Sequence, residues 1–525
     1  MDIIILKSFL PETFLSLSIL LQLIFNARFI NDSKFNFPTI DNEVTYQIFF
    51  ILGCLVLLFF NLKIEGILSN FLFINDESTK FLKIMMVFIC LMSLSAISRS
   101  FSVQNLNFFE FFNIFLLSLL SLLLLVSSYD LISFYLTIEM QTLCFYVLST
   151  FQRNSAFSTE SGLKYFISGS FISGFFLFGA SILYGCLGTL NLHDIHLLLS
   201  FPINFYDATL NYSSSSYDFF DIGFNLVIAT SILLITVTLL FKIGCAPFHF
   251  WSPDVYEGAP LSSTIIFSII PKIAVLCFFI RFICSTNVFY VDMQEILLFF
   301  GLFSTFLGTF FALSQIRLKR LIIYSSVAQI GFVVIALSIN SLQGFSAMYF
   351  FLFIYLITSI LVWGHVTAFY NFQSKIYSFY SKPSSSLFVS SLANFFKLNN
   401  LWSFSFVIML FSIAGIPPLS GFLGKILILS ELINISYWKS SILLILISSI
   451  SVFYYIRLIK LAFFEPKKSD FNAEQSQSQI VSYNSSLDFL YLTLVVCLFL
   501  LITIFFLPTG PFLLCQYIVL ASAGF

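Results

Sequence analysis

Apolar runs of about 20 residues recur from one end of the chain to the other, separated by polar segments. A run of this length lets a helix cross the hydrocarbon core of a bilayer, since each helical residue adds about 1.5 Å along the axis. The pattern therefore predicts an all-α integral membrane protein with about 14 transmembrane helices. The predicted spans are residues 8–27, 45–62, 81–98, 111–128, 131–151, 163–188, 223–251, 261–280, 293–315, 321–340, 344–370, 401–434, 440–463 and 487–508.

Three longer polar stretches interrupt the spans and are predicted to be extramembrane loops: 189–222, 373–400 and 465–486. Neither the Ser-rich loop 201–222 nor the tail 509–525 carries a motif that assigns it a role. The spans suggest four parts: residues 1–110 with helices 1–3, a first repeat at 111–284, a second repeat at 285–464, and residues 465–525 with a loop, helix 14 and the tail.

The composition supports a membrane protein, because 59% of the 525 residues are hydrophobic and 9% are charged, against about 25% charged in an ordinary soluble domain. A net charge of −1 argues against nucleic acid as a partner. The nine cysteines form no CxxC pair, so neither a disulfide framework nor a cysteine-ligated metal is indicated. No GxGxxG or P-loop motif is present. The first residues, MDIIILKSFLPETF, do not resemble a cleaved targeting segment.

Basic residues are unevenly distributed among the predicted loops. Fifteen follow odd-numbered spans and five follow even-numbered spans. The positive-inside rule places the loops after odd-numbered spans, here named the basic face, on the matrix or cytoplasmic side. Both termini are then expected on the opposite side. The five basic residues that follow even-numbered spans are Lys63, Lys80, Lys83, Arg281 and Lys439.

Four ionisable residues lie deep in spans that otherwise carry no charge: Glu139, Lys242, Lys272 and Lys425. A charged side chain at the bilayer centre costs about 2.5–3.5 kcal/mol on the mildest scale. A fixed ion pair between Glu139 and Lys242 could serve only to orient helices. One glutamate cannot neutralise three lysines, however, so at least two amines need a neutral state or a water-filled cavity. Desolvation lowers the pKa of an amine and a nearby carboxylate raises it, so groups of this kind suit a proton relay.

Prolines interrupt two of the longest spans. Pro247 lies in FKIGCAPFHFW and deprives the carbonyl of Ile243 of its helical donor. Pro417 and Pro418, in SIAGIPPLSGFLGK, do the same to the second span. Broken helices 7 and 12 therefore occupy the fourth position of spans 4–8 and of spans 9–13. This spacing predicts two inverted five-helix repeats, as in many transporters.

Weaker signals surround these residues. His249 follows Pro247 and is either a relay group or an interfacial histidine. The basic turn of Arg317, Lys319 and Arg320 is interpreted as a topological signal rather than a catalytic one. The HxxH pair in a loop, His193 and His196, is too weak to indicate a metal site.

At these residues the chain resembles the antiporter-like membrane subunits of respiratory NADH:ubiquinone oxidoreductase (complex I). The run around Glu139, with the loop that follows it, resembles the subunit 2 branch of that family most specifically. The similar segments are IEMQTLCFYVLSTFQRNSAFSTESGLKYFISG (138–169), FKIGCAPFHFWSPDVYEGAP (241–260), PKIAVLCFFIRF (271–282), RLKRLIIYSSVAQIGF (317–332) and SIAGIPPLSGFLGK (412–425).

The resemblance implies a proton-translocating subunit of the respiratory chain in which Glu139 modulates Lys242, Lys272 is the central relay and Lys425 is the exit-side carrier. It implies no redox centre in this chain. NADH, FMN, iron–sulfur clusters and ubiquinone are expected in partner subunits, and lipids and sister antiporter-like subunits are expected as neighbours. The location implied is the mitochondrial inner membrane with an organelle-encoded gene, while a plastid or bacterial origin stays open.

Two other functions are compatible with the same residues. A stand-alone cation/proton antiporter would use the same fold and the same lysines. A structural membrane scaffold would keep Glu139 and Lys242 as a fixed pair, and would tolerate neutral residues at both positions.

Overall fold

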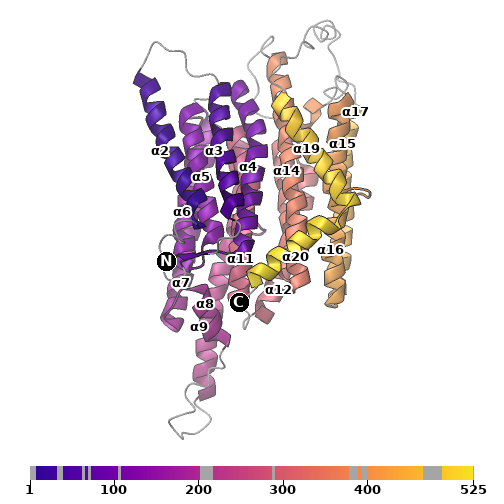
Figure 1. Ribbon diagram of the computed structural model, residues 1–525. Helices are drawn as coiled ribbons and strands as arrows, with labels where there is room; N and C mark the ends of the chain where they lie inside the picture. The colour runs from indigo at the N-terminus through magenta and orange to yellow at the C-terminus, as the bar shows by residue number, and fades with distance from the viewer. Residues whose placement is uncertain are drawn as a thin grey trace.

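The computed structural model describes residues 8–31, 40–61, 66–68, 72–104, 108–200, 217–286, 290–377, 388–392, 400–464 and 488–523. These residues form helices along almost their whole length, as expected for a multi-pass membrane protein (Figure 1). The helices are α2 (Leu10–Asn31), α3 (Ile40–Phe60), α4 (Glu77–Gln104), α5 (Phe108–Ser127), α6 (Leu131–Ser149), α7 (Ala156–Leu187), α8 (Leu192–Ser200), α9 (Tyr217–Ile243), α10 (Trp251–Gly258), α11 (Leu261–Ser285), α12 (Tyr290–Ser314), α13 (Leu318–Leu337), α14 (Leu342–Tyr377), the 3₁₀ turn η3 (Val389–Leu392), α15 (Asn400–Ala414), α16 (Ser420–Asn434), α17 (Trp438–Phe463), α19 (Asp488–Phe506) and α20 (Thr509–Ala523).

Ten helices in the described residues are long and apolar enough to cross a membrane, and up to 11 if the bent pair α19 and α20 counts as one span. Three shorter apolar helices coincide with predicted spans 1, 2 and 12: Leu10–Ile24, Val44–Phe60 and Trp402–Ala414. An all-helical multi-pass architecture is therefore confirmed. The number 14 and the inverted repeats stay predictions.

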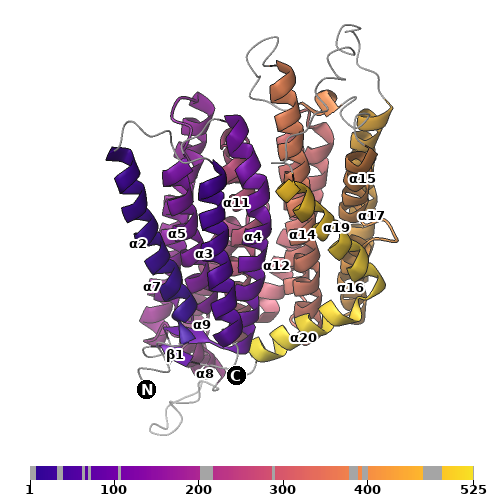
Figure 2. The ribbon, with the colours of Figure 1, turned by 45° about the horizontal axis from the view of Figure 1, so that its top comes forward.

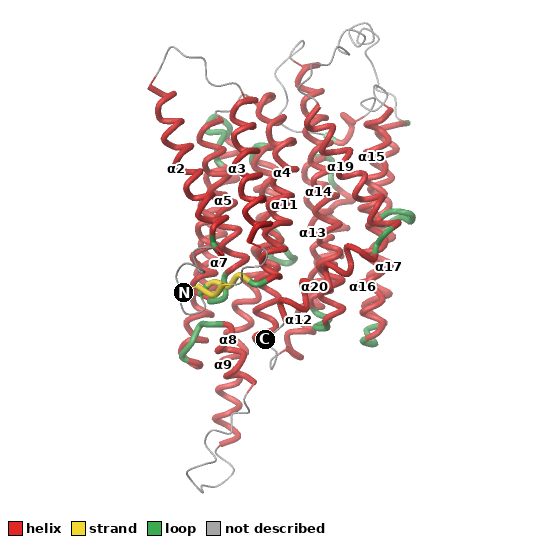
Figure 3. Tube along the Cα trace, viewed as in Figure 1, coloured by secondary structure: helices red, strands yellow, loops and turns green. Residues whose placement is uncertain are grey.

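A small antiparallel hairpin departs from the all-α prediction. Strands β1 (Gly66–Leu68) and β2 (Phe73–Asn75) pair between α3 and α4 (Figure 3), and the side-chain amide of Asn75 donates to the carbonyl of Ser8 at 2.5 Å. The amide of Tyr129 donates to the carbonyl of Leu72 at 3.0 Å, so the hairpin is joined to the turn between α5 and α6. Apolar run length could not predict it, because strands of three residues leave no periodic signal.

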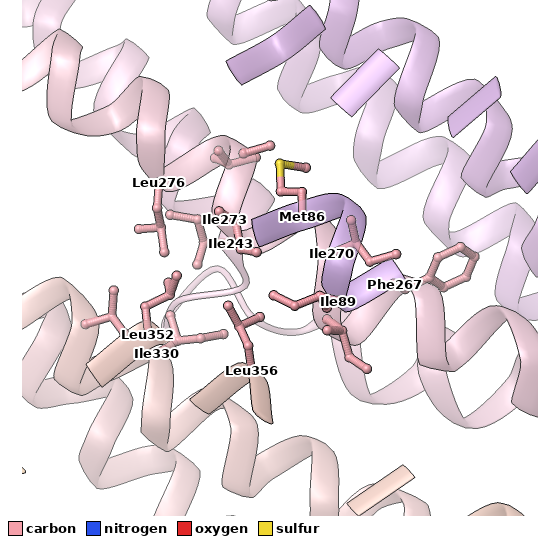
Figure 4. Packing of buried hydrophobic residues seen from close by; sticks show 14 of the residues in the cluster. Met86, Ile89, Ile243, Phe267, Ile270, Ile273, Leu276, Ile330, Leu352 and Leu356 are labelled. Carbon is pink, nitrogen blue, oxygen red and sulfur yellow. The ribbon is translucent and has the colours of Figure 1, made fainter. Parts of the chain in front are cut away.

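The core is continuous from one side of the molecule to the other. Helix α11 lies at its centre and is buried along nearly all of its length, with α4, α5, α9 and α14 packed around it. Figure 4 shows Met86 of α4, Ile270 of α11 and Leu352 of α14 among the interlocking apolar side chains. This packing holds α11, which carries Lys272, against helices of both predicted repeats.

The polar stretches predicted as loops are partly helical. Residues 189–222 contain α8 and the first turn of α9, whereas residues 201–216 lie outside the described residues. The stretch 373–400 contains the end of α14 and the turn η3, and the stretch 465–486 lies outside the described residues. The Ser-rich composition of 201–222 predicted a loop, but helix α9 begins within it at Tyr217.

Residues 509–523 of the tail fold as helix α20, whereas the sequence analysis assigned the tail no role. Helix α20 bends by 89° away from α19 and crosses α14 and α4 (Figure 2). Phe512 packs against Phe350 of α14, with ring centroids 5.9 Å apart. The hydroxyl of Tyr517 donates to the carboxylate of Glu77 at the start of α4. The tail therefore ties the two halves of the bundle together.

Three basic residues that were counted with loops after even-numbered spans, Lys80, Lys83 and Arg281, are buried inside helices. Lys83 of α4 is 1% exposed and donates to Glu12 of α2 at 2.5 Å and to Asn75 at 2.6 Å. Arg281 of α11 is 3% exposed and donates to the carbonyl of Val126 at the end of α5, at 2.8 Å. Lys83 and Arg281 therefore have intramolecular partners rather than loop positions, which corrects the count. Lys319, which was counted with the basic face, is likewise buried in a helix.

Candidate functional site

The first helix break separates α9 from α10 and is built on Gly244. Gly244 has φ of 81°, a left-handed conformation that glycine adopts without steric cost. Its amide donates to the carbonyls of Leu240 and Phe241 at 3.1 and 3.0 Å, and the amide of Cys245 donates back to Leu240 at 3.0 Å. This pattern closes the helix in the manner of a Schellman motif. The peptide before Pro247 is cis, and the chain becomes helical again at Trp251.

The second break separates α15 from α16 and repeats this backbone arrangement. Gly415 has φ of 82°. Its amide donates to the carbonyls of Phe411 and Ser412 at 3.0 and 3.1 Å, and the amide of Ile416 donates to Phe411 at 3.1 Å. The peptide between Pro417 and Pro418 is cis, as is the peptide at the equivalent place of the first break. Each break therefore reads Gly-x-x-Pro, a correspondence that spacing alone did not reveal.

Lys425 of α16 points back to the second break. Its Nζ atom donates to the carbonyls of Ile413 and Ala414 at 3.1 and 2.8 Å, and its side chain is 6% exposed. These carbonyls end α15 and lack helical donors, so the lysine satisfies them and lies at the negative end of the helix dipole. The ring of Phe332 lies 5.4 Å from the same Nζ atom.

Lys242 of α9 precedes the first break and has a different environment. Its Nζ atom is buried and has no hydrogen-bond partner in the described part of the chain. Glu139 of α6 acts on it electrostatically, but no ion pair joins these two residues. One carboxylate oxygen of Glu139 accepts a long hydrogen bond from Thr142 at 3.4 Å, and the other has no partner among described residues. Glu139 and Lys242 therefore interact electrostatically without forming a direct ion pair.

Lys272 of α11 lies between the two breaks, and its partner comes from the second predicted repeat. Its Nζ atom donates to the hydroxyl of Tyr355 of α14 at 2.5 Å, and its side chain is buried. Pro271 immediately precedes it inside α11 and provides no amide for the carbonyl of Phe267. The hydroxyl of Tyr256 of α10 donates to that carbonyl at 3.2 Å.

Three cavities connect the lysines in sequence. The first is lined by Lys242, Lys272 and Tyr256. The second is also lined by Tyr256, together with Tyr355 and Gln329. Tyr355, Gln329, Thr358 and Ile413 line both the second cavity and the third, which contains Lys425. The lysines thus face a single series of cavities that runs from the first break to the second.

The remaining predicted residues lie around this series. His249 is buried in the first break and stacks on Phe250 with ring centroids 4.9 Å apart, but it lines none of the three cavities. Pro247, Pro417 and Pro418 lie in the breaks, outside the cavity linings. Among the described residues, no group of three or more His, Cys, Asp or Glu side chains is arranged to hold a metal ion.

Sequence reasoning missed Tyr355, Tyr256 and Gln329. Tyr355 is an isolated polar group in the apolar run FLFIYLIT, and buried tyrosine hydroxyls usually find a partner. That signal could have marked it as a candidate. Gln329 donates from Nε2 to the carbonyl of Ile413 at 3.3 Å, the same oxygen that accepts from Lys425. Only the three-dimensional arrangement reveals this shared acceptor.

Comparisons with known proteins show which family the chain is similar to. The family described as "NADH:quinone oxidoreductase/Mrp antiporter, TM" matches residues 128–453. NADH-ubiquinone oxidoreductase chain 2 of Marchantia polymorpha is 33% identical over 464 residues, which cover 87% of this chain and 89% of the relative. NADH-quinone oxidoreductase subunit N of Pelagibacter ubique is 32% identical over 474 residues, with 90% and 92% covered.

Solved structures share the fold. A chain of respiratory complex I from Thermus thermophilus superposes with a TM-score of 0.71 at 22% identity, covering 95% of this chain and 97% of that chain. A chain of the Mrp complex from Dietzia superposes with a TM-score of 0.77 at 16% identity, covering 99% and 97%. Taken with the curated relatives, these matches establish that the chain belongs to the NADH:quinone oxidoreductase/Mrp antiporter membrane family, in the branch of NADH-ubiquinone oxidoreductase chain 2 and subunit N.

Proposed function

We propose that this chain, a membrane subunit of NADH:quinone oxidoreductase, carries protons through the series of cavities that joins Lys242, Lys272 and Lys425. The single observation that supports the proposal most directly is this continuity of lining residues. Hydroxyl, amide and amine groups face the cavities, which is the setting in which proteins hold internal water. Water and side chains would then alternate as proton carriers.

In the proposed relay, the field of Glu139 sets how readily Lys242 accepts a proton. Lys242 has no hydrogen bond among described residues to hold it, so its amine is free to exchange a proton with the first cavity. Lys272 receives the proton and shares it with Tyr355. Lys425 would complete the transfer, with the carbonyls of Ile413 and Ala414 stabilising its charged form. His249 is proposed only as an accessory group, since it lines none of these cavities.

The proposed relay rests on two inverted units at residues 111–284 and 285–464, each with a broken fourth helix. The matching hydrogen bonds at Gly244 and Gly415 support this division. Residues 1–110 would flank the first unit, and residues 465–525 would contribute helix 14 and the tail. Counting the broken helices as single spans, the proposed total is 14.

The redox chemistry is proposed to take place in other subunits, which would hold NADH, FMN, iron–sulfur clusters and ubiquinone. Sister antiporter-like subunits and lipids are the proposed neighbours. The mitochondrial inner membrane is the proposed location, and the similarity to chain 2 proteins supports it. A change of charge in a neighbouring subunit would reach this chain through Glu139.

A stand-alone cation/proton antiporter is the second candidate, and the fold shared with a chain of the Mrp complex favours it. The two functions differ in what drives the proton. Sodium-dependent proton exchange by the purified chain in vesicles, without NADH, would support the antiporter. Proton movement that requires NADH oxidation in the assembled oxidoreductase supports the relay.

The test is Lys272→Met in the assembled oxidoreductase, measured in sealed membranes. Proton translocation per NADH oxidised should fall by about tenfold or more, because a thioether cannot accept a proton. Lys439→Met is the matched control, since Lys439 is exposed and outside the cavities. Normal translocation in Lys272→Met would contradict the relay, and so would an equal loss in the control.

A further inference from the structure

Helix α10 is held on the basic face by a network of charged residues, here named the α10 clamp. Its members are Asp254 and Glu257 of α10, Arg317 before α13, Arg320 of α13 and Lys164 of α7. Arg317 donates to Glu257 at 2.5 Å, and Arg320 donates to Asp254 at 3.1 Å and forms an ion pair with Glu257. Lys164 reaches Asp254 at 3.1 Å. The basic turn, which the sequence suggested was only topological, therefore has defined carboxylate partners.

Helix α10 depends on such contacts because it has only eight residues and no side-chain cap at its N-terminus. An isolated helix of this length is not stable in itself, since nucleation costs more than so few hydrogen bonds return. Gly258 brings α10 close to α7, where an added Cβ would lie 2.6 Å from the carbonyl oxygen of Phe157. Lys319 donates to the carbonyl of Ala259, just after α10, at 3.3 Å.

The clamp members are not equal. Asp254, Lys164, Arg317 and Arg320 have side chains 36–48% exposed, so their individual pairs are expected to contribute little. The side chain of Glu257 is only 16% exposed and forms ion pairs with both arginines. Removing an arginine leaves the negative charge of this largely buried carboxylate with fewer positive partners. Removing one partner of a buried ion pair destabilises a protein strongly, because the remaining charge is uncompensated. Glu257 is therefore the anchor of the clamp.

Tyr256 lies between the two clamp carboxylates in sequence and faces the opposite way, into the protein. Tyr256 is the one described residue that lines both the first and the second cavity. It lines the first together with Lys242 and Lys272, and the second together with Tyr355 and Gln329. Its hydroxyl donates to the carbonyl that Pro271 leaves without a helical donor. A shift of α10 would therefore move the side chain at which the two cavities meet.

We propose that the α10 clamp positions Tyr256 at the junction of the first and second cavities, and that Glu257 and Arg317 are positioning residues for proton transfer between them. The inference rests on the proposed relay. It adds to the relay a residue that lines both the first and the second cavity, which none of the relay lysines does. The clamp joins α7 and α10 of the first predicted repeat to α13 of the second. It thereby links the two predicted repeats to each other on the basic face.

The experiment uses the assembled oxidoreductase in sealed membranes and compares Arg317→Glu, Glu257→Arg and the charge-swapped double variant. Proton translocation per NADH oxidised should be largely lost in each single variant, because like charges push α10 away from α13. The double variant should regain part of it, because the pair between positions 257 and 317 re-forms with reversed signs while the new arginine at position 257 still lies beside Arg320. Glu160→Gln is the matched control, since Glu160 is 61% exposed and contacts only Lys164 among the clamp residues.

Two further measurements separate positioning from a general loss of folding. Native gels should show the assembled complex at normal abundance in the double variant. Tyr256→Phe keeps the ring but removes the hydroxyl, so it should reduce translocation, and adding Arg317→Glu to it should cause little further loss because both act at one junction. Failure of the double variant to recover, or additive losses, would overturn the inference.

The outcome is distinguishable from failure of the relay itself. If Lys272→Met abolishes translocation while Arg317→Glu and Glu257→Arg leave it normal, the clamp inference fails and the relay stands. If Lys272→Met leaves translocation normal, the proposed relay is contradicted. Any loss of translocation in the clamp variants would then have to arise from a proton path that does not include Lys272.

Discussion

The two helix breaks have the same backbone but opposite arrangements of their lysines. Lys242 comes before its break and has no hydrogen-bond partner among the described residues. Lys425 comes after its break and returns to bind the carbonyls that the break exposes. The comparison teaches that the Gly-x-x-Pro turn is a common frame, whereas the position of the lysine decides whether its amine is fixed. One end of the cavity series thus has a loosely held amine and the other a tightly held one.

The glycines give the largest expected difference between the breaks. Both have φ above 80°, so Gly244→Ala and Gly415→Ala each cost about 1–2 kcal/mol from the left-handed backbone alone. At Gly415 a Cβ would also lie 2.9 Å from Cδ of Lys425, while at Gly244 the nearest atoms are 3.9 Å away. Gly415→Ala should therefore lower the thermal unfolding temperature of the complex further and displace Lys425. Equal effects in thermal scans would mean that the second break has no special tie to its lysine.

The lysines provide the next comparison. Lys425→Met leaves the carbonyls of Ile413 and Ala414 without this donor, at a cost of about 1–3 kcal/mol. Lys242→Met removes an amine without a hydrogen bond among described residues, so stability should be unchanged or higher. Both variants should lose proton translocation. Thermal scans of the two variants, run beside translocation assays, check this divergence, and matching losses of stability would contradict it.

The smallest expected effect concerns a tryptophan. The indole Nε1 of Trp251 donates to the carbonyl of Phe241 at 3.0 Å, across the first break. Trp251→Phe keeps an aromatic ring but removes this hydrogen bond, at a cost of about 1 kcal/mol. Phe422 follows Gly415 by the same number of residues as Trp251 follows Gly244 and carries no such donor, so Phe422→Leu should not remove a hydrogen bond across the second break. Hydrogen exchange at the amides of Gly244 and Gly415 in each variant measures the difference.

Much of this arrangement was accessible from sequence, and the parts that were not have a common cause. Runs of apolar residues predicted the helices, and the high cost of buried charge selected Glu139, Lys242, Lys272 and Lys425. Prolines located the breaks, because a missing amide is a local property. The contacts of Lys272 with Tyr355, and of Arg317 with Glu257, join residues 60 or more positions apart and leave no local pattern.

Other misses have a similar origin. Lys83 and Arg281 were taken for loop residues because their charge suggested exposure, whereas each finds a partner on another helix. Helix α20 was left unassigned because a short apolar tail is compatible with several environments. A Glu139–Lys242 ion pair was considered from charge alone, which predicts attraction but not contact. Charge in the sequence therefore selected these residues as candidates, and it left open whether Glu139 and Lys242 are in direct contact.

The carbonyl of Ile413 accepts hydrogen bonds from both Lys425 and Gln329. Its bond order, and hence its stretching frequency in the infrared, depends on whether the amine still donates to it. An isotopic label at this one peptide group would thus turn the end of α15 into an optical reporter of proton arrival, with every side chain left as nature made it.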